Sequence, residues 1–191
     1  MEPLILASNS PRRKELLSRV GIPFVVDAAE VDEHCALPPA EAVAFLSRRK
    51  ALAVAARRPG RYVLGADTLV AIGDTALGKP ADAEDARSML RRLSGRTHQV
   101  YTGVTVVAPD GGVFTEADRS DVTFCPLTAE EIDAYVRSGE PLDKAGSYAI
   151  QGRAALWITR LEGSDTSVIG LPLYLVRSLL MEAGYPLTAD L

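Results

Sequence analysis

A serine, a proline and three basic residues near the start of the chain form a segment suited to binding an anion, Ser10-Pro11-Arg12-Arg13-Lys14. Ser10 can cap a helix, and Pro11 suits its first turn. A helix N-terminus offers backbone N–H groups and a partial positive charge, and Arg can hold a phosphate through two hydrogen bonds. The segment indicates a phosphate site, with a capped surface helix carrying solvated arginines as the alternative.

Carboxylates occur on two separate segments. Asp67 follows an apolar run and a Gly-Ala pair, and we place it at a strand end, where it could hold a metal ion or orient water. The alternative is an Asx turn. Glu30, Asp32 and Glu33 form a second acidic group on a loop, which could simply be solvated. Two carboxylate loops suit Mg²⁺ or Mn²⁺, because these hard cations prefer oxygen ligands.

Lysine is rare in this chain, which otherwise uses arginine, and the lysines at 50 and 79 have notable surroundings. Lys50 lies within a long helical pattern, and Lys79 lies between Gly78 and Pro80 in a loop where the backbone can approach a ligand. Gln151 lies in a Gly-containing polar loop, and its amide can both donate to and accept from a nucleobase edge. Each residue alone could equally be an ordinary surface residue.

The composition excludes several classes of protein. The 191 residues are 47% hydrophobic and carry a net charge of −4, which argues against a nucleic-acid-binding surface. Two distant cysteines and two histidines do not form a zinc motif, and we expect reduced thiols. We find neither a Walker A loop nor a GxGxxG motif. Without a signal peptide or membrane-spanning segment, we expect a cytoplasmic protein with no membrane partner.

Strand and helix signals alternate along the chain and must position these residues. The expected strands are 4–7, 23–27, 62–64 with a possible extension over 69–72, 100–108, 113–115, 121–124 and 154–158. The expected helices are 11–20, a long one after 38–39 that ends at 59–60, 82–93, 128–137 and 172–181. Asp110-Gly111-Gly112 indicates a hairpin turn, and the segments 163–165 and 170–172 indicate turns. The pattern predicts a mixed α/β protein with some antiparallel pairing.

The order of these motifs resembles that of the Maf family. The matching segments run from residue 4 to about 182: Ser8-x-Ser10-Pro11-Arg12-Arg13, Val31-Asp32-Glu33, Lys50-Ala51, Gly65-Ala66-Asp67-Thr68, Gly78-Lys79-Pro80, Ser94-Gly95-x-Thr97-His98, Lys144-Ala145-Gly146-x-Tyr148-x-Ile150-Gln151-Gly152 and Val168-x-Gly170-Leu171-Pro172. The resemblance implies one domain over residues 1–191, with an elongated mixed sheet flanked by helices and two lobes about a cleft, as in inosine triphosphate pyrophosphatase.

The resemblance also implies a reaction, the hydrolysis of a nucleoside triphosphate to the monophosphate and pyrophosphate. It assigns Asp67 as the proton acceptor and gives Glu33 and Asp67 a divalent metal, which could be Mg²⁺, Mn²⁺ or Co²⁺. The residues that would neutralise or bind the triphosphate are Ser8, Ser10, Arg13, Lys50 and Lys79. A homodimer is compatible with the family.

Three positions separate the family's branches by base preference, and here they are Arg12, Thr68 and Gln151. The combination resembles the branch that acts on dTTP and UTP, including modified pyrimidine nucleotides. An amide suits a pyrimidine because it can pair with an imide N–H and a carbonyl together. Asp165 departs from the family pattern. The alternatives are a non-catalytic nucleotide-binding regulator of cell division and septum formation, or a purine-directed housecleaning enzyme.

Overall fold

A computed structural model describes residues 2–73 and 75–187. The strands are β1 (Leu4–Leu6), β2 (Phe24–Val26), β3 (Val63–Ile72), β4 (Thr75–Leu77), β5 (Thr97–Val107), β6 (Val113–Phe124) and β7 (Ile158–Glu162). The α-helices are α1 (Pro11–Arg19), α2 (Pro39–Ala55), α3 (Ala83–Leu93), α4 (Ala129–Arg137), α5 (Asp165–Ile169) and α6 (Leu173–Glu182). Three short 3₁₀ helices are η1 (Glu140–Asp143), η2 (Ala145–Ser147) and η3 (Arg153–Trp157).

The strands form a mixed sheet, as the sequence predicted. Its order is β2-β1-β3-β5-β6-β7, with β4 paired to β3. The β1–β2 and β1–β3 pairs are parallel, whereas the β3–β4 and β6–β7 pairs are antiparallel. Within the described ranges, no helix is both long enough and apolar enough to cross a membrane.

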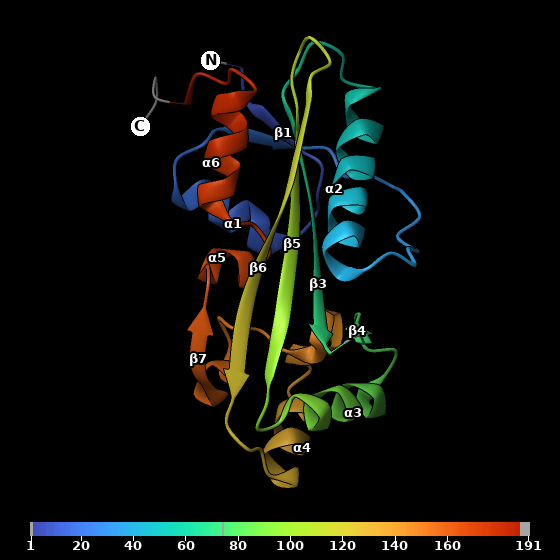
Figure 1. The fold of residues 1–191 in the computed structure, drawn as a ribbon, viewed down its shortest axis with the longest axis vertical. Coiled ribbons are helices and arrows are strands. Elements are labelled where there is room, and N and C mark those ends of the chain that lie inside the picture. Colours follow the sequence, from blue (N-terminus) through green and yellow to red (C-terminus); the bar gives the residue numbers. More distant parts are fainter. Residues whose placement is uncertain (1, 74, 188–191) are drawn as a thin grey trace. The chain divides into compact units, whose positions relative to one another are not determined.

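The described residues fall into two compact units. The first unit contains residues 2–67, 102–118 and 170–187. Figure 1 shows α2 on one side of its strands, with α1 and α6 on the other. Glycines allow α2 to lie close to two strands, because a Cβ at Gly65 or at Gly103 would overlap the backbone of α2. This close packing fixes the distance between the helix and β3.

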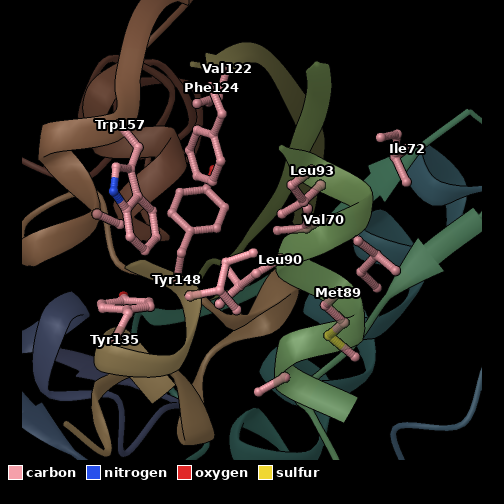
Figure 2. Packing of buried hydrophobic residues seen from close by; sticks show 14 of the residues in the cluster. Val70, Ile72, Met89, Leu90, Leu93, Val122, Phe124, Tyr135, Tyr148 and Trp157 are labelled. Carbon is pink, nitrogen blue, oxygen red and sulfur yellow. The ribbon is translucent and has the colours of Figure 1, made fainter. Parts of the chain in front are cut away.

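The second unit contains residues 68–101 and 119–169 and has an aromatic core. Figure 2 shows Phe124, Tyr148, Trp157 and Tyr135 next to one another, with aliphatic side chains of α3 beside them. The rings of Phe124 and Tyr148 have centroids 4.9 Å apart and meet edge to face, as do those of Tyr135 and Trp157. Such pairs add to the stabilisation from burial alone. The polar loops of this unit therefore rest on a well-packed base.

Most of the expected helix ends are confirmed. Asp82 caps α3 by accepting hydrogen bonds from the backbone of Glu84 and Asp85, and Thr128 and Glu131 form the expected capping box of α4. Ser10 is at the N-cap of α1, but its side chain makes no capping hydrogen bond. The structure also contains β4 and α5, which the sequence analysis did not anticipate; α5 begins at the expected turn 163–165.

The prediction of a strand over 154–158 is wrong, because 153–157 form η3 and β7 begins only at Ile158. A strand would bury alternate residues. Instead Ala154 and Trp157 are buried while Leu156 is 86% exposed, which is the spacing of a 3₁₀ turn. Burial of the Trp157 ring against Phe124 and Tyr135 outweighs the strand propensity of this segment.

Candidate active site

Asp67 lies in the middle of β3 rather than at a strand end, because the strand continues to Ile72. Side chains two residues apart share one face of a strand, so Asp67 faces the same way as Gly65. A Cβ on Gly65 would lie 2.5 Å from the carbonyl oxygen of Ser47 in α2. Asp67 therefore faces a helix that the missing side chain of Gly65 allows to come close.

Lys50 is the partner that α2 presents to this carboxylate. It lies on the buried face of the helix, in register with Val43, Ser47 and Val54. The Lys50 Nζ atom donates to Asp67 Oδ1 at 2.6 Å and lies 2.8 Å from Glu33 Oε1. Lys50 and Asp67 are both largely buried, so the attraction between them is screened little by water. One ammonium group thus holds two carboxylates together.

Glu33 comes from the loop after β2, which the sequence analysis marked as acidic. Asp32 accepts a hydrogen bond from the backbone N–H of His34 at 2.9 Å, which shapes the loop next to Glu33. The side chain of Glu33 remains 58% exposed although it contacts Lys50. Glu33 is therefore the water-facing member of the pair and Asp67 the buried one.

Ser8 and Arg13 form the second polar group of the first unit. Arg13 donates from Nη1 to Ser8 Oγ at 3.0 Å and from Nε to the carbonyl of Gly170 at 2.9 Å. The backbone N–H of Ser10 also donates to Ser8 Oγ, at 3.2 Å. A hydroxyl has two acceptor sites and one hydrogen, so Ser8 keeps its hydrogen as the group it can offer to an anion. Gly170 is a partner that the sequence analysis did not identify.

The charges of these residues act on one another. Burial lowers the pKa of Arg13, the Asp67 carboxylate opposes that change, the charge of Arg12 adds to it, and Glu33 opposes it. Arg stays protonated in proteins, so Arg13 remains a cation at this position. The first unit therefore combines three cations, Arg12, Arg13 and Lys50, with two carboxylates in a single electrostatic neighbourhood.

The other predicted residues belong to the second unit. Thr68 is half-buried on β3, while Lys79 and Gln151 are exposed on loops. The two loops are joined, because the backbone N–H of Gly146 donates to the carbonyl of Gly78 at 3.1 Å. The structure thus groups Lys79 with the loop of Gln151, and it groups Ser8, Arg13, Lys50, Asp67 and Glu33 in the first unit.

Two residues of the second unit that sequence reasoning missed hold the Gln151 loop, Tyr135 and Glu140. Tyr135 receives a hydrogen bond from Ala149, and Glu140 receives one from Arg153. No spacing rule connects a tyrosine in a helix with a backbone amide 14 residues later. The only sequence signal is the polar Ser-Gly-Glu segment at 138–140, directly after α4.

The carboxylates of Glu33 and Asp67 fit a hard divalent cation. Mg²⁺ is commonly bound by one or two carboxylates together with substrate phosphates, rather than by a complete protein cage. Residues 2–73 and 75–187 contain no group of three or more His, Cys, Asp or Glu side chains able to hold a metal. One oxygen of Glu33 and one of Asp67 already lie next to the same positive charge, the ammonium group of Lys50. These residues could therefore hold a metal that arrives with a triphosphate.

Known proteins resemble this chain over nearly its whole length. Residues 3–183 match the family described as Maf-like protein. A dTTP/UTP pyrophosphatase of Symbiobacterium thermophilum is 53% identical over 189 residues, covering 98% of this chain and 97% of the relative. The dTTP/UTP pyrophosphatase of Myxococcus xanthus is 51% identical over 186 residues, covering 96% and 94%.

Solved structures share the fold at low sequence identity. The Ham1 protein of Staphylococcus aureus has a TM-score of 0.54 at 15% identity, covering 95% of this chain and 99% of its own. The HAM1 protein of Coxiella burnetii has the same TM-score at 14% identity, covering 95% and 100%. With about half of its residues identical to those relatives and a family match that covers both units, this chain belongs to the Maf-like protein family.

Proposed function

We propose that the protein is a nucleoside triphosphate pyrophosphatase that hydrolyses dTTP and UTP to the monophosphate and pyrophosphate, and so removes unwanted pyrimidine nucleotides. The observation that carries the proposal is the Lys50 ammonium between Asp67 and Glu33, next to Arg13. Relatives that are 53% and 51% identical bear the name dTTP/UTP pyrophosphatase, which supports the choice of substrate.

In the proposed reaction, Asp67 orients a water molecule and accepts its proton as the water oxygen attacks the α-phosphorus. A bond forms from the water oxygen to the α-phosphorus. The bond from the α-phosphorus to the oxygen that bridges the α- and β-phosphates breaks, and pyrophosphate leaves. Lys50 and Arg13 offset the charge that builds up on the phosphate oxygens, and Ser8 donates its hydroxyl hydrogen to one of them. When bound at Glu33 and Asp67, a divalent cation such as Mg²⁺, Mn²⁺ or Co²⁺ would supply further positive charge to the phosphates.

The side chains assigned to base selection are Arg12, Thr68 and Gln151, with Lys79 assigned to the triphosphate. The amide of Gln151 is exposed and can pair with the N–H and a carbonyl of thymine or uracil. We place the enzyme in the cytoplasm, which the free thiols of Cys35 and Cys125 support, and assign it no nucleic-acid partner. A homodimer stays a prediction.

The regulator of cell division is the less favoured alternative. A protein that only sensed nucleotides would need the cations but would have no need of carboxylates that hold a metal and accept a proton. This chain has both carboxylates, and Asp67 is fixed in a strand and paired with Lys50. Tight nucleotide binding in the presence of metal, without turnover, would favour the regulator.

Pyrophosphate release from dTTP and UTP, measured with Mg²⁺ or Mn²⁺, tests the proposal. Asp67→Asn should lower turnover by about 10²- to 10⁴-fold, because an amide accepts a proton poorly. The matched control is Asp27→Asn, which removes a carboxylate of the same unit that pairs with Arg57 and Arg58 instead. An inactive parent protein would refute the pyrophosphatase, and a near-normal Asp67→Asn would exclude Asp67 as the base.

A further inference from the structure

A tyrosine and a glutamate hold the main chain on both sides of Gln151. The hydroxyl of Tyr135 accepts a hydrogen bond from the backbone N–H of Ala149 at 3.1 Å and donates one to Glu140 Oε1 at 2.9 Å. The Glu140 carboxylate in turn accepts from the backbone N–H of Arg153, at 3.1 Å from Oε1 and 3.4 Å from Oε2. The two held amides lie two residues before and two residues after Gln151.

Gly152 completes this arrangement. A Cβ built on Gly152 would overlap the carboxyl group of Glu140, so the carboxylate can occupy its position only because residue 152 has no side chain. Glu140 could move away only by giving up its hydrogen bonds to Tyr135 and to the Arg153 amide. The glycine next to Gln151 is therefore explained by packing against Glu140.

Tyr135 itself is buried and packed against another aromatic ring. Tyr135 is 3% exposed, and its ring meets the Trp157 ring edge to face with centroids 4.9 Å apart (Figure 2). Burial raises the pKa of Tyr135, so its hydroxyl keeps the hydrogen that it donates to Glu140. Gly146 anchors the beginning of the loop, since its N–H bonds to Gly78 and a Cβ there would press on Val70. The exposed Gln151 thus projects from a loop whose backbone is held at three points.

We propose that Tyr135 and Glu140 are positioning residues for base selection, which act by fixing the backbone on either side of Gln151. The inference rests on the proposed function, because it takes Gln151 as the residue that pairs with thymine or uracil. Selection between bases of similar size depends on polar groups in fixed places, since a correct base gains hydrogen bonds that an incorrect one leaves unmade. Without these hydrogen bonds to the loop backbone, Gln151 would keep its amide, but the amide would no longer be held in a fixed position.

Nucleotide binding in the Asp67→Asn background tests the inference, because turnover is suppressed there and affinity can be measured directly. The measurement is the ratio of the dissociation constants of dCTP and dTTP. Tyr135→Phe keeps the ring that packs on Trp157 but removes the hydroxyl, and we expect it to lower the ratio roughly tenfold, the scale of one lost buried hydrogen bond. Glu140→Ala should lower the ratio likewise, and Glu140→Gln, which keeps an acceptor oxygen, should largely restore it.

The matched control is Tyr174→Phe. Tyr174 also donates its hydroxyl to a carboxylate, Asp118 Oδ1, at 2.5 Å, but in the first unit. This variant should leave the ratio unchanged. Hydrogen exchange supplies an independent measure, since the amides of Ala149 and Arg153 should exchange faster in Tyr135→Phe than in Tyr174→Phe.

A double-mutant cycle shows whether Tyr135 acts through Gln151. In Gln151→Ala, adding Tyr135→Phe should lower the ratio no further, because the side chain being positioned is already absent. Full additivity of the two changes would overturn the inference, and so would faster exchange at Ala149 with an unchanged ratio. Failure of the proposed function has a separate signature, which is a parent protein that releases no pyrophosphate.

Discussion

The two units present their functional side chains in different ways. In the first unit, Lys50 and Asp67 belong to a helix and a strand, and they meet in a largely buried ion pair. In the second unit, Lys79 and Gln151 are exposed on loops, and the core of this unit is aromatic. The positions of Lys50 and Asp67 are set by the packing of a helix on a strand, whereas the position of Gln151 is set by hydrogen bonds to the backbone of its loop.

This difference follows the kinds of work that we assign to the two groups. The carboxylate that accepts a proton and its cationic partner must be held within a fraction of an ångström, which helices and strands do better than loops. A residue that recognises a nucleobase must contact the ligand and therefore has to lie at the surface, where loops carry most binding residues. The comparison predicts that substitutions at Lys50 disturb folding and reaction together, whereas substitutions in the Gln151 loop change selectivity alone.

Removing the buried charge should have the largest effect. Lys50→Met leaves Asp67 buried without its cation and lets it repel Glu33, so we expect a loss of about 3 kcal/mol in stability and at least a hundredfold in turnover. Urea unfolding and pyrophosphate release measure the two losses. The control is Arg87→Met, which removes a more exposed pair with Asp133 in the second unit and should lower stability much less, because water screens that pair. Equal losses in the two variants would contradict the comparison.

Gly65→Ala should have a smaller effect on stability, through the packing of α2 on β3 in the first unit. The added methyl would overlap the Ser47 carbonyl and press α2 away from β3, at a cost of about 1–3 kcal/mol. Because Asp67 faces the same helix, we also expect turnover to fall roughly tenfold as Lys50 moves with α2. Gly78→Ala is the control for stability, since nothing lies within 4 Å of a Cβ there. An unaltered unfolding midpoint in Gly65→Ala would show that α2 can shift freely.

The effect that we expect to be smallest at neutral pH is a pH dependence of stability that belongs to the second unit. Burial lowers the pKa of His98 to about 4, and its Nε2 lies 2.8 Å from the Tyr148 hydroxyl. Unfolded His98, with a pKa near its ordinary value of about 6.5, takes up a proton that the folded form does not, so stability should fall as the pH drops from about 6.5 to 4. His98→Gln should flatten this part of the curve, and His34→Gln, at an exposed position, should not. An identical slope in both variants would assign the effect to other groups.

The sequence predicted the parts of the fold that local rules govern. The helix after Pro11, the α3 cap at Asp82 and the capping box at Thr128 all follow from neighbouring residues. The side chain of Ser10 is the exception, because it lies at the N-cap of α1 but makes no capping hydrogen bond. The roles that we propose for Asp67 and Glu33 come from the family resemblance.

Contacts between distant segments could not be predicted in this way. The resemblance assigned Lys50 to the triphosphate, but only the packing of α2 on β3 shows that it lies between two carboxylates. Asp67 was expected at a strand end because Gly65 interrupts the apolar run, whereas β3 continues through the possible extension to Ile72. The strand expected over 154–158 failed for the same reason, since burial of Trp157 depends on rings from other elements.

The grip of Tyr135 and Glu140 on main-chain amides has a consequence for how such an enzyme can evolve. Both held N–H groups belong to the backbone of Ala149 and Arg153, and neither contact involves the side chain at 151. Because both N–H groups belong to other residues, an exchange of the side chain at 151 removes neither hydrogen bond. If Gln151 reads the nucleobase as proposed, a substitution at this exposed position can change base preference while the hydrogen bonds that support the loop are kept.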